Sequence, residues 1–467
     1  MQNSGERTVS LSALGVGLLH AWLWSVLYSV IVYPFNDTSA ETHLAIMVCW
    51  NATLIVSYAA MTALNSMLSE LHLRRKITGA FSIIGSLGTF FVSVSPYQSL
   101  VDPLQLALAG VVLVALGMSM LNVAWTQSFS YMDYRQVQAS SALFIAFGAT
   151  MFLICTLIPR NLAVVAVALF PIISFALMQT KDMTSLRASQ GEANARNKQM
   201  SKFPYALFVL CLFLFAVANS YLRGLTLSFV SLQYNMGAQL LFSSIIAIGF
   251  VLAFAKSQKL IYSGAVLLIA GGLGLLPFTT SGVGTAMVGL GFICFEVLAW
   301  MVIAETIKKH RGSSVRIASA TWMGLSGGSL VGILAGTAVT YYGGTQTIVG
   351  VAVSLALAYG ILIVFVLTFN RTFLDVFKPA PDKNQPLSLI VKKGASFARE
   401  YGLTERETEV MQILINGRNA KYIEKSLFIS SNTVKSHIKN IYRKAEVNSK
   451  EELLDKVLEM EASGIDD

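Results

Sequence analysis

Long apolar runs separated by short polar segments fill the first 369 residues of the chain. A helix needs about 20 mostly apolar residues to cross a bilayer. Twelve runs reach that length, and we expect each to be a spanning helix: 9–33, 43–66, 77–95, 104–125, 138–158, 161–179, 204–230, 236–255, 260–278, 284–305, 315–340 and 346–369. The split between the fifth and sixth runs depends on the short segment Pro159-Arg160-Asn161.

The pattern changes after residue 369, where polar and charged residues become frequent. Residues 378–386 contain three prolines and have the composition of a semi-extended linker. Beyond residue 400, apolar residues recur at helical spacing in four short segments. The sequence therefore predicts an all-α chain in three parts: a twelve-helix transmembrane bundle over 1–369, a linker over 370–399 and a four-helix domain over 400–467.

Each of the four short segments begins with a residue that caps helices. Two of them open with capping boxes, in which a hydroxyl side chain and a glutamate three residues later bond to each other's backbone N–H groups. The other two open with single polar caps. The predicted starts are Thr404 to Glu407, Asn419, Ser430, and Ser449 to Glu452.

Charge is scarce and unevenly distributed. Only 13% of residues are charged, against about 25% in soluble domains. The first 369 residues hold 18 Lys+Arg and 10 Asp+Glu, while the remaining 98 hold 16 and 15. The four cysteines stand singly in apolar runs without metal-binding spacing, so we expect them to be small buried side chains and expect no metal and no cofactor.

The basic residues between the spans predict how the bundle is oriented. If the N-terminus lies inside, the inner loops hold 16 Lys+Arg and the outer loops only Arg160. Such a bias fixes the basic loops on the cytoplasmic side. We therefore expect a multi-pass protein of the cytoplasmic membrane with both termini in the cytoplasm, where DNA lies.

The longest polar loop of the bundle, 180–203, divides the spans into two groups of six, 1–179 and 204–369. Two six-helix halves joined by an inner loop resemble the major facilitator superfamily, which implies a binding site near the midplane between the halves. That superfamily carries a glycine- and aspartate-containing signature between spans two and three. Here the corresponding segment, 65–76, keeps the basic cluster Arg74-Arg75-Lys76 and lacks the glycines and the aspartate.

Polar residues within the spans are candidates for ligand sensing because they are costly in hydrocarbon. Arg223 and Glu296 either form a structural pair or leave Arg223 to meet a ligand anion. Further residues line a polar, aromatic cavity, or else serve as interhelical and interfacial contacts: Asn51, Asn122, Asn219 and Trp300, with Trp22, Trp50, Trp125 and Trp322. Gly328, Gly332 and Gly336 recur every four residues, which predicts close packing of that helix on a neighbour.

The third short helix of the tail has two distinct faces. Val434, Ile438 and Ile441 follow an i, i+4, i+7 pattern and predict an inward stripe. A second stripe is polar and mostly cationic, and the segment has no acidic residue: Asn432, Lys435, Ser436, Lys439 and Arg443. A basic helix rich in hydrogen-bond donors suits the major groove of DNA.

The tail resembles the LuxR-type helix-turn-helix over about 60 residues. The resemblance rests on residues 403–410, Gly417 and residues 429–444. It implies base contacts from Lys435, Ser436 and Lys439, and phosphate contacts from Thr433, His437 and Lys444. It also implies dimerisation through the fourth helix, with Leu453, Leu454 and Val457 as the candidate residues.

Together these features resemble the bacterial membrane-bound LuxR regulators. We expect a one-component transcription regulator whose bundle senses a small-molecule effector and whose tail binds double-stranded promoter DNA as a homodimer. The alternative is a major-facilitator-type transporter with a regulatory DNA-binding tail. The chain shows no phosphate loop, metal-ligand spacing or nucleophile elbow, so we do not expect an enzyme.

Overall fold

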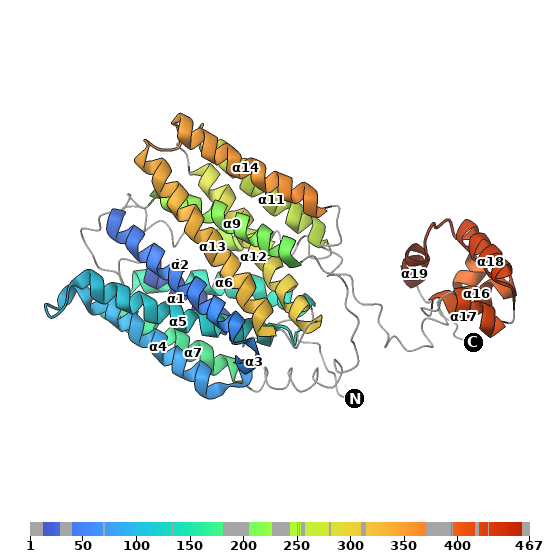
Figure 1. Cartoon of the computed structure of the whole chain (residues 1–467), viewed down its shortest axis with the longest axis horizontal. Helices are drawn as coiled ribbons and strands as arrows, with labels where there is room; N and C mark the ends of the chain where they lie inside the picture. Colours follow the sequence, from blue (N-terminus) through green and yellow to red (C-terminus); the bar gives the residue numbers. More distant parts are fainter. Residues whose placement is uncertain are drawn as a thin grey trace. The chain divides into compact units, whose positions relative to one another are not determined.

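The structure is a computed structural model of the whole chain. It describes residues 13–28, 40–68, 71–132, 134–180, 205–226, 243–249, 251, 253, 257–279, 282–309, 314–369, 394, 396–415, 420–427 and 429–459. The chain divides into two compact units, Met1–Lys378 and Pro379–Asp467, and Figure 1 shows the helices that compose each of them.

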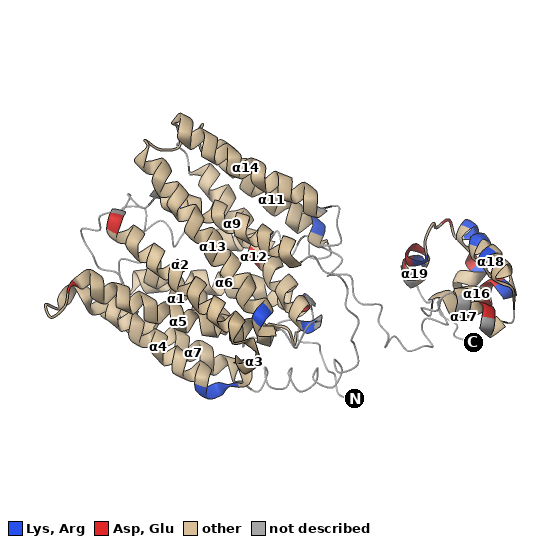
Figure 2. Ribbon diagram, in the orientation of Figure 1, with Lys and Arg blue, Asp and Glu red and all other residues tan. Residues whose placement is uncertain are grey.

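The first unit is a bundle of apolar helices. Its helices are α1 (Leu14–Tyr28), α2 (Ala40–Ala63), α3 (Asn65–Leu68), α4 (Arg75–Val94), α5 (Pro103–Phe129), α6 (Tyr134–Leu157), α7 (Arg160–Met178), α9 (Tyr205–Thr226), α11 (Gln258–Leu275), α12 (Val283–Lys309), α13 (Ser314–Tyr341) and α14 (Ile348–Phe369). Figure 2 shows that their charged residues lie mostly at helix ends. This pattern is the one expected where hydrocarbon surrounds the middle of each helix.

Ten helices in the described part of the chain are long and apolar enough to cross a membrane, and they confirm ten of the predicted spans. The first predicted span, 9–33, is described over α1 only, which has 15 residues. Most of the eighth, 236–255, lies outside the described residues. The separation of α6 from α7 is also confirmed, because α6 ends at Leu157 and Pro159 stands at the N-cap of α7.

The two halves of the bundle meet through a few pairs of helices. In the first half α4 packs on α5, and α1 packs on α6 and α7; in the second α9 packs on α13, and α11 packs on α12 and α14. The main contacts between halves are α2 with α13 and α6 with α12. Helix α1 is buried on every side, with 13 of its 15 residues buried, so it is a core element of the bundle.

The glycine stripe of α13 does pack closely on a neighbour, as predicted, and that neighbour is α9. A Cβ atom added at Gly328, Gly332 or Gly336 would overlap a backbone carbonyl oxygen of α9. At Gly327, on another side of α13, the added atom would lie at an ordinary 3.6 Å from the ring of Phe213. The two helix backbones therefore approach each other because those three positions carry no side chain.

The second unit contains the four predicted tail helices, α16 (Glu405–Ile415), α17 (Ala420–Leu427), α18 (Ser431–Lys444) and α19 (Lys450–Glu459). The capping box of α16 is present, since Glu407 N donates to Thr404 Oγ1 (3.3 Å) and Thr404 N donates to Glu407 Oε2 (2.9 Å). Ser449 Oγ accepts from Glu452 N at the start of α19 (3.1 Å). The expected cap Asn419 lies outside the described residues.

The folded tail starts earlier than residue 400, the boundary that the sequence predicts. Residues 396–400 are helical and fall within the predicted linker. Phe397 and Ala398 are buried in the core of this unit, and the Phe397 ring stacks on Tyr401 with 4.4 Å between ring centroids. The prediction missed this short helix because the preceding residues are rich in proline and have the composition of a linker. The helix is stabilised by its tertiary packing on the core of the tail.

Crowding the contact between α13 and α9 should destabilise the bundle. We expect Gly332→Ala to lower the stability of the full-length protein by about 1–3 kcal/mol, the usual cost of overpacking, because the new methyl group meets the carbonyl of Val217. The measurement is the temperature at which half of the detergent-solubilised protein still elutes as a single peak. Gly327→Ala is the matched control, and equal midpoints for the two variants would contradict the packing described here.

Candidate nucleic-acid interface and membrane-embedded site

Helix α18 is positioned by its cap and its inner stripe. Ser430 is the N-cap, and its side chain accepts a hydrogen bond from Thr433 N (3.2 Å). Val434 and Ile441 are fully buried in the core of the tail, and Ile438 packs against that core. The inward stripe predicted from the sequence is therefore confirmed, and it turns the opposite face of the helix outward.

The outward face of α18 gathers the residues expected to meet DNA. Thr433, Lys435, Ser436, Lys439 and Arg443 are exposed, and His437 is half-buried. The three cations stand four residues apart and so lie along one side of the helix. Figure 2 shows this cationic stripe along α18, which contains no acidic residue.

Lys444 stands apart from that stripe because its ammonium group already has partners. Its Nζ donates to Glu407 Oε2 (2.7 Å) and to the carbonyl oxygen of Gly402 (2.8 Å). The Glu407 side chain is 6% exposed and the Lys444 side chain 29%. Lys444 thus fastens α18 to the start of α16, and the phosphate contact inferred for it stays a prediction.

The Glu407 carboxylate carries a shifted pKa. Burial raises its pKa, but hydrogen bonds from Lys444 and Thr404 and the charge of Lys444 outweigh that effect, so the pKa lies below its ordinary value. A carboxyl group with a lower pKa in the folded state stabilises the fold above its unfolded pKa. That stabilisation is lost as the pH falls through the folded pKa.

The residues expected to mediate dimerisation have a role within one copy of the tail. Leu453 and Val457 are fully buried in its core, and Leu454 packs against that core. The side chains of Leu453 and Val457 cannot cover a partner without opening the core, whereas Leu454 keeps part of its surface exposed. On α19, the outward side offers Glu451, Glu452 and Asp455, which are exposed, so a dimer contact through this helix stays a prediction and would involve that side.

Within the bundle, Glu296 and Arg223 do not pair with each other. Glu296 on α12 lies 2.8 Å from Nε2 of His20 on α1. The other ring nitrogen of His20, Nδ1, lies 2.9 Å from the carbonyl oxygen of Val16. The His20 ring is therefore held on one side by its own helix and on the other by the Glu296 carboxyl group. This contact joins the two halves of the bundle.

Arg223 on α9 makes a second contact with α1. Its guanidinium donates to the hydroxyl of Tyr28 and lies over the Tyr28 ring, 4.7 Å from the centroid. His20, Trp24 and Tyr28 follow each other at intervals of four residues, so they form one stripe of α1. The sequence prediction missed His20 and Tyr28, although a polar and aromatic stripe at helical spacing in the first span was a usable signal.

The three asparagines predicted to take part in sensing differ in how far their side chains are already hydrogen-bonded within the bundle. Asn51 is buried and donates to the carbonyl oxygen of Met47 (2.8 Å), within its own helix. Asn122 donates to the Tyr58 hydroxyl (3.4 Å), while its buried Oδ1 has no hydrogen-bond partner in the part of the chain that the structure describes. Asn219 is half-buried on α9, one turn before Arg223.

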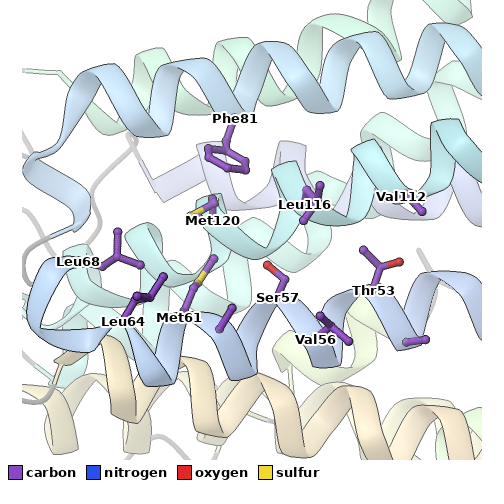
Figure 3. A pocket seen from close by; sticks show the side chains of 12 residues that line it. Thr53, Val56, Ser57, Met61, Leu64, Leu68, Phe81, Val112, Leu116 and Met120 are labelled. Atoms are coloured by element: carbon purple, nitrogen blue, oxygen red, sulfur yellow. The ribbon is translucent and has the colours of Figure 1, made fainter.

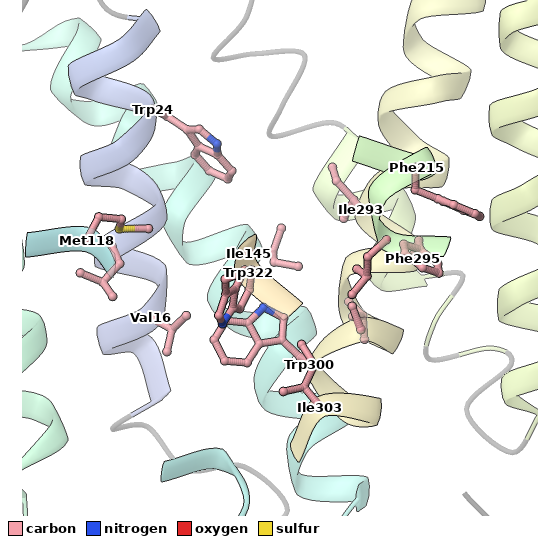
Figure 4. Packing of buried hydrophobic residues seen from close by; sticks show 14 of the residues in the cluster. Val16, Trp24, Met118, Ile145, Phe215, Ile293, Phe295, Trp300, Ile303 and Trp322 are labelled. Atoms are coloured by element: carbon pink, nitrogen blue, oxygen red, sulfur yellow. The ribbon is translucent and has the colours of Figure 1, made fainter. Parts of the chain in front are cut away.

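Trp300 occupies the centre of an aromatic cluster between the halves. Its ring lies 5.1 Å from Phe129, 5.3 Å from Phe144 and 5.2 Å from Trp322, measured between centroids. Figure 4 shows the two tryptophans side by side. Trp322 donates to Thr126 Oγ1 (2.9 Å), whereas the buried Nε1 of Trp300 has no hydrogen-bond partner among the described residues. A buried donor of this kind is costly unless a ligand or water satisfies it.

The ion pair between Lys444 and Glu407 should make the stability of the tail depend on pH. For residues 394–467 we expect the urea midpoint to fall as the pH drops below about 4.3, the unfolded pKa of glutamate. Glu407→Gln should cost about 1–3 kcal/mol at pH 7, because the partly buried ammonium of Lys444 loses its ionic partner. This variant should also show a weaker dependence on pH.

The matched control for this experiment is Glu409→Gln, which removes an exposed glutamate paired with Arg406. It should change the midpoint little, since exposed ion pairs contribute about 0–1 kcal/mol. Equal losses at the two positions would contradict the structural role of the pair.

The tail is similar to known bacterial regulators. Residues 402–457 match the family described as bacterial regulatory proteins, luxR family. The chain is 38% identical over 68 residues to the spore germination protein GerE of Bacillus subtilis, and the match covers 15% of this chain and 92% of GerE. It is 44% identical over 48 residues to the transcriptional regulatory protein DegU of Brevibacillus brevis, covering 10% of this chain and 20% of DegU. The chain thus spans about a fifth of the length of DegU.

The bundle is similar in fold to membrane transporters. The human organic anion transporter MFSD10 superposes with a TM-score of 0.55 at 13% identity, over 76% of this chain and 97% of that protein. The major facilitator superfamily transporter FucP, in an outward conformation, gives a TM-score of 0.51 at 13% identity, over 77% of this chain and 99% of its own. The chain therefore belongs to the luxR family of bacterial regulatory proteins, and it joins a LuxR-type DNA-binding domain to a membrane bundle of major facilitator fold.

Proposed function

We propose that the protein is a membrane-embedded, one-component transcription regulator in which the bundle senses a small molecule and the tail binds promoter DNA. The observation that carries this proposal is the outward cationic stripe of α18, which lies in the same chain as ten helices of membrane-spanning length. A receptor in the membrane and a DNA-binding helix in one chain need no separate signalling partner.

On DNA, α18 enters the major groove with its outward face toward the base pairs. Lys435, Ser436 and Lys439 contact bases, while Thr433, His437 and Arg443 contact the phosphate backbone. Base contacts give specificity and phosphate contacts give position and salt dependence. The domain acts as a dimer through α19, and the bilayer raises the local concentration of tails when bundles associate.

The orientation of the bundle supports this use of the tail. The basic loops that alternate along the chain lie on the cytoplasmic side by the positive-inside rule. Both termini are then cytoplasmic, and the tail is in the compartment that holds the chromosome.

The sensing site lies between the halves, around α1, α5 and α12. Glu296 and His20 supply ionisable groups there, and the buried atoms Trp300 Nε1 and Asn122 Oδ1, which have no hydrogen-bond partner among the described residues, supply a donor and an acceptor. A ligand that bonds to these groups changes the contacts between halves, which is how a membrane bundle of this fold responds to binding.

A transporter with a regulatory tail is the second candidate, and the fold shared with transporters favours it. A direct test compares the full-length chain with a variant ending at residue 378. A regulator should drive a reporter behind its target promoter only with the tail present, and membrane vesicles containing the bundle alone should bind the effector without accumulating it. Accumulation by the truncated bundle would make the transporter the better description.

DNA binding should depend on the exposed lysines of α18. We expect Lys435→Ala and Lys439→Ala each to weaken promoter binding by the tail by about 1–3 kcal/mol, as for loss of a base contact. The measurement is a mobility shift with the promoter and a scrambled fragment, at two salt concentrations. Lys450→Ala, which removes the same charge from α19, should retain both affinity and sequence preference.

Unaltered sequence preference in both α18 variants would contradict this assignment. A uniform loss of affinity for the promoter and the scrambled fragment would reassign both lysines to phosphate contacts.

The response to effector should depend on the charged residues of the bundle. We expect Glu296→Gln and Arg223→Leu to shift the dose response of a reporter. The first replaces the carboxyl group that meets His20 of α1 by a neutral amide, and the second removes the contact of Arg223 with Tyr28 of α1. DNA binding by the isolated tail should be unaffected. Ser263→Ala is the control, since its hydroxyl is exposed and bonds only to the carbonyl of Lys259. A normal dose response in both variants at normal expression would exclude these residues from sensing.

A further inference from the structure

A groove runs along the outside of the bundle between α2 and α4, with α5 as its floor. Its volume is about 520 Å³. Figure 3 shows side chains from α2 and α5 along it, with Phe81 of α4 above them. Ala60 and Val56 of α2 line the groove and are exposed, so it opens on the side of the bundle that faces lipid.

The lining of the groove selects a hydrocarbon occupant. Of the side chains that line it, only Thr53 and Ser57 are polar. The Thr53 hydroxyl donates to the carbonyl oxygen of Cys49 (2.8 Å), and the Ser57 hydroxyl shares a hydrogen bond with Ser119 (2.6 Å). Both hydroxyls are therefore engaged within the bundle, and a polar ligand would lose its bonds to water on entry.

The length of the groove corresponds to one leaflet of a membrane. It extends along α2 from Ala52 to Leu64, and a rise of about 1.5 Å per residue over these twelve steps gives about 18 Å. The hydrocarbon core of a bilayer is about 30 Å thick. An extended acyl chain of one leaflet therefore matches the groove in depth as well as in chemistry.

Cations stand at the end of the groove near Leu64 and Leu68. Arg74, Arg75 and Lys76 are exposed at the start of α4, where Figure 2 shows their positive charge. Arg74 is the N-cap of α4, and it precedes Phe81 by seven residues, or about two helical turns. The cationic cluster thus lies at the end of α4, about two turns from the side chain of α4 that lines the groove.

We propose that this groove and the cluster Arg74-Arg75-Lys76 form a binding site for an anionic phospholipid. One acyl chain lies between α2 and α4, and the headgroup phosphate lies against the cations. Charge complementarity favours an anionic headgroup over a zwitterionic one, because each basic residue near a membrane surface attracts anionic lipid. The site is separate from the contacts of His20 and Glu296 between the halves.

A lipid in this site would affect the contact between α2 and α13, which joins the two halves of the bundle. Helix α2, which forms one wall of the groove, also packs on α13. Thr62 bonds to Ser319 (2.8 Å), and Asn65 Oδ1 accepts from Arg316 N (3.0 Å). A lipid that supports α2 from one side therefore acts on the helix that holds the halves together, and lipid composition becomes an input to the protein.

The test is competitive lipid retention by the purified full-length protein. The protein is equilibrated in detergent with equal amounts of phosphatidylglycerol and phosphatidylcholine of the same chain length, and retained lipids are counted by native mass spectrometry. We expect preferential retention of phosphatidylglycerol. Ala60→Trp, which fills the groove, should abolish the preference, and Arg74→Gln should weaken it about fivefold, as for loss of one cation at a membrane surface.

Matched controls separate the site from general effects. Ala356→Trp places the same side chain on an exposed position of α14, and Lys259→Gln removes an exposed cation at the start of α11. Both should retain phosphatidylglycerol as the wild type does. If Ala60→Trp fails to fold, a photoactivatable acyl chain on phosphatidylglycerol should label wild-type peptides that contain Met61, Phe81 or Met120.

Three results would overturn the proposal. The first is equal retention of the two lipids by the wild type. The second is unchanged retention in Ala60→Trp, or photolabelling confined to helices other than α2, α4 and α5. The third is retention of a free fatty acid in place of phosphatidylglycerol, which would leave the groove as a site for a single-chain acid.

Discussion

A charged side chain inside hydrocarbon must find a partner, and in this bundle α1 provides partners for two of them. Its His20 meets Glu296 of α12, and its Tyr28 meets Arg223 of α9. Both partners belong to the second half of the bundle, so these contacts tie the first span to the opposite half. This explains why α1 is buried on every side, and why a ligand that competes for Glu296 or Arg223 would alter how the halves fit together.

The two units of the chain use charge in opposite ways. In the bundle, charges are few and are paired or placed at helix ends, because hydrocarbon penalises them. In the tail, Lys444 and Glu407 form a partly buried pair that holds α18 on α16, while the other cations of α18 face outward without acidic neighbours on that helix. The pair of Lys444 with Glu407 thus contributes to the stability of the tail, while Lys435, Lys439 and Arg443 remain exposed. Variants at these two groups of residues can therefore separate folding from DNA binding.

Local patterns predicted most of the fold, and long-range partners were the part that they could not predict. Spans and capped helices depend on the spacing of residues close in sequence. The helix boundary at Pro159 and the N-cap at Ser430 could therefore be predicted from the sequence. The partner of Glu296 is 276 residues away, and a histidine within an apolar run gives no indication of its partner. Similarly, helical spacing marked Leu453 and Val457 as an apolar face, but only the packed tail shows that this face fills its own core.

In the mechanism that we propose, the DNA-binding tail acts while joined to the membrane bundle. The most direct test is to cross-link the protein to DNA in responding cells. The protein carries one tag at its N-terminus and a different tag at its C-terminus. We expect promoter DNA to be recovered from the membrane fraction with both tags, on a chain of full length. Recovery of promoter DNA with the C-terminal tag alone, on a soluble fragment the size of the tail, would contradict it.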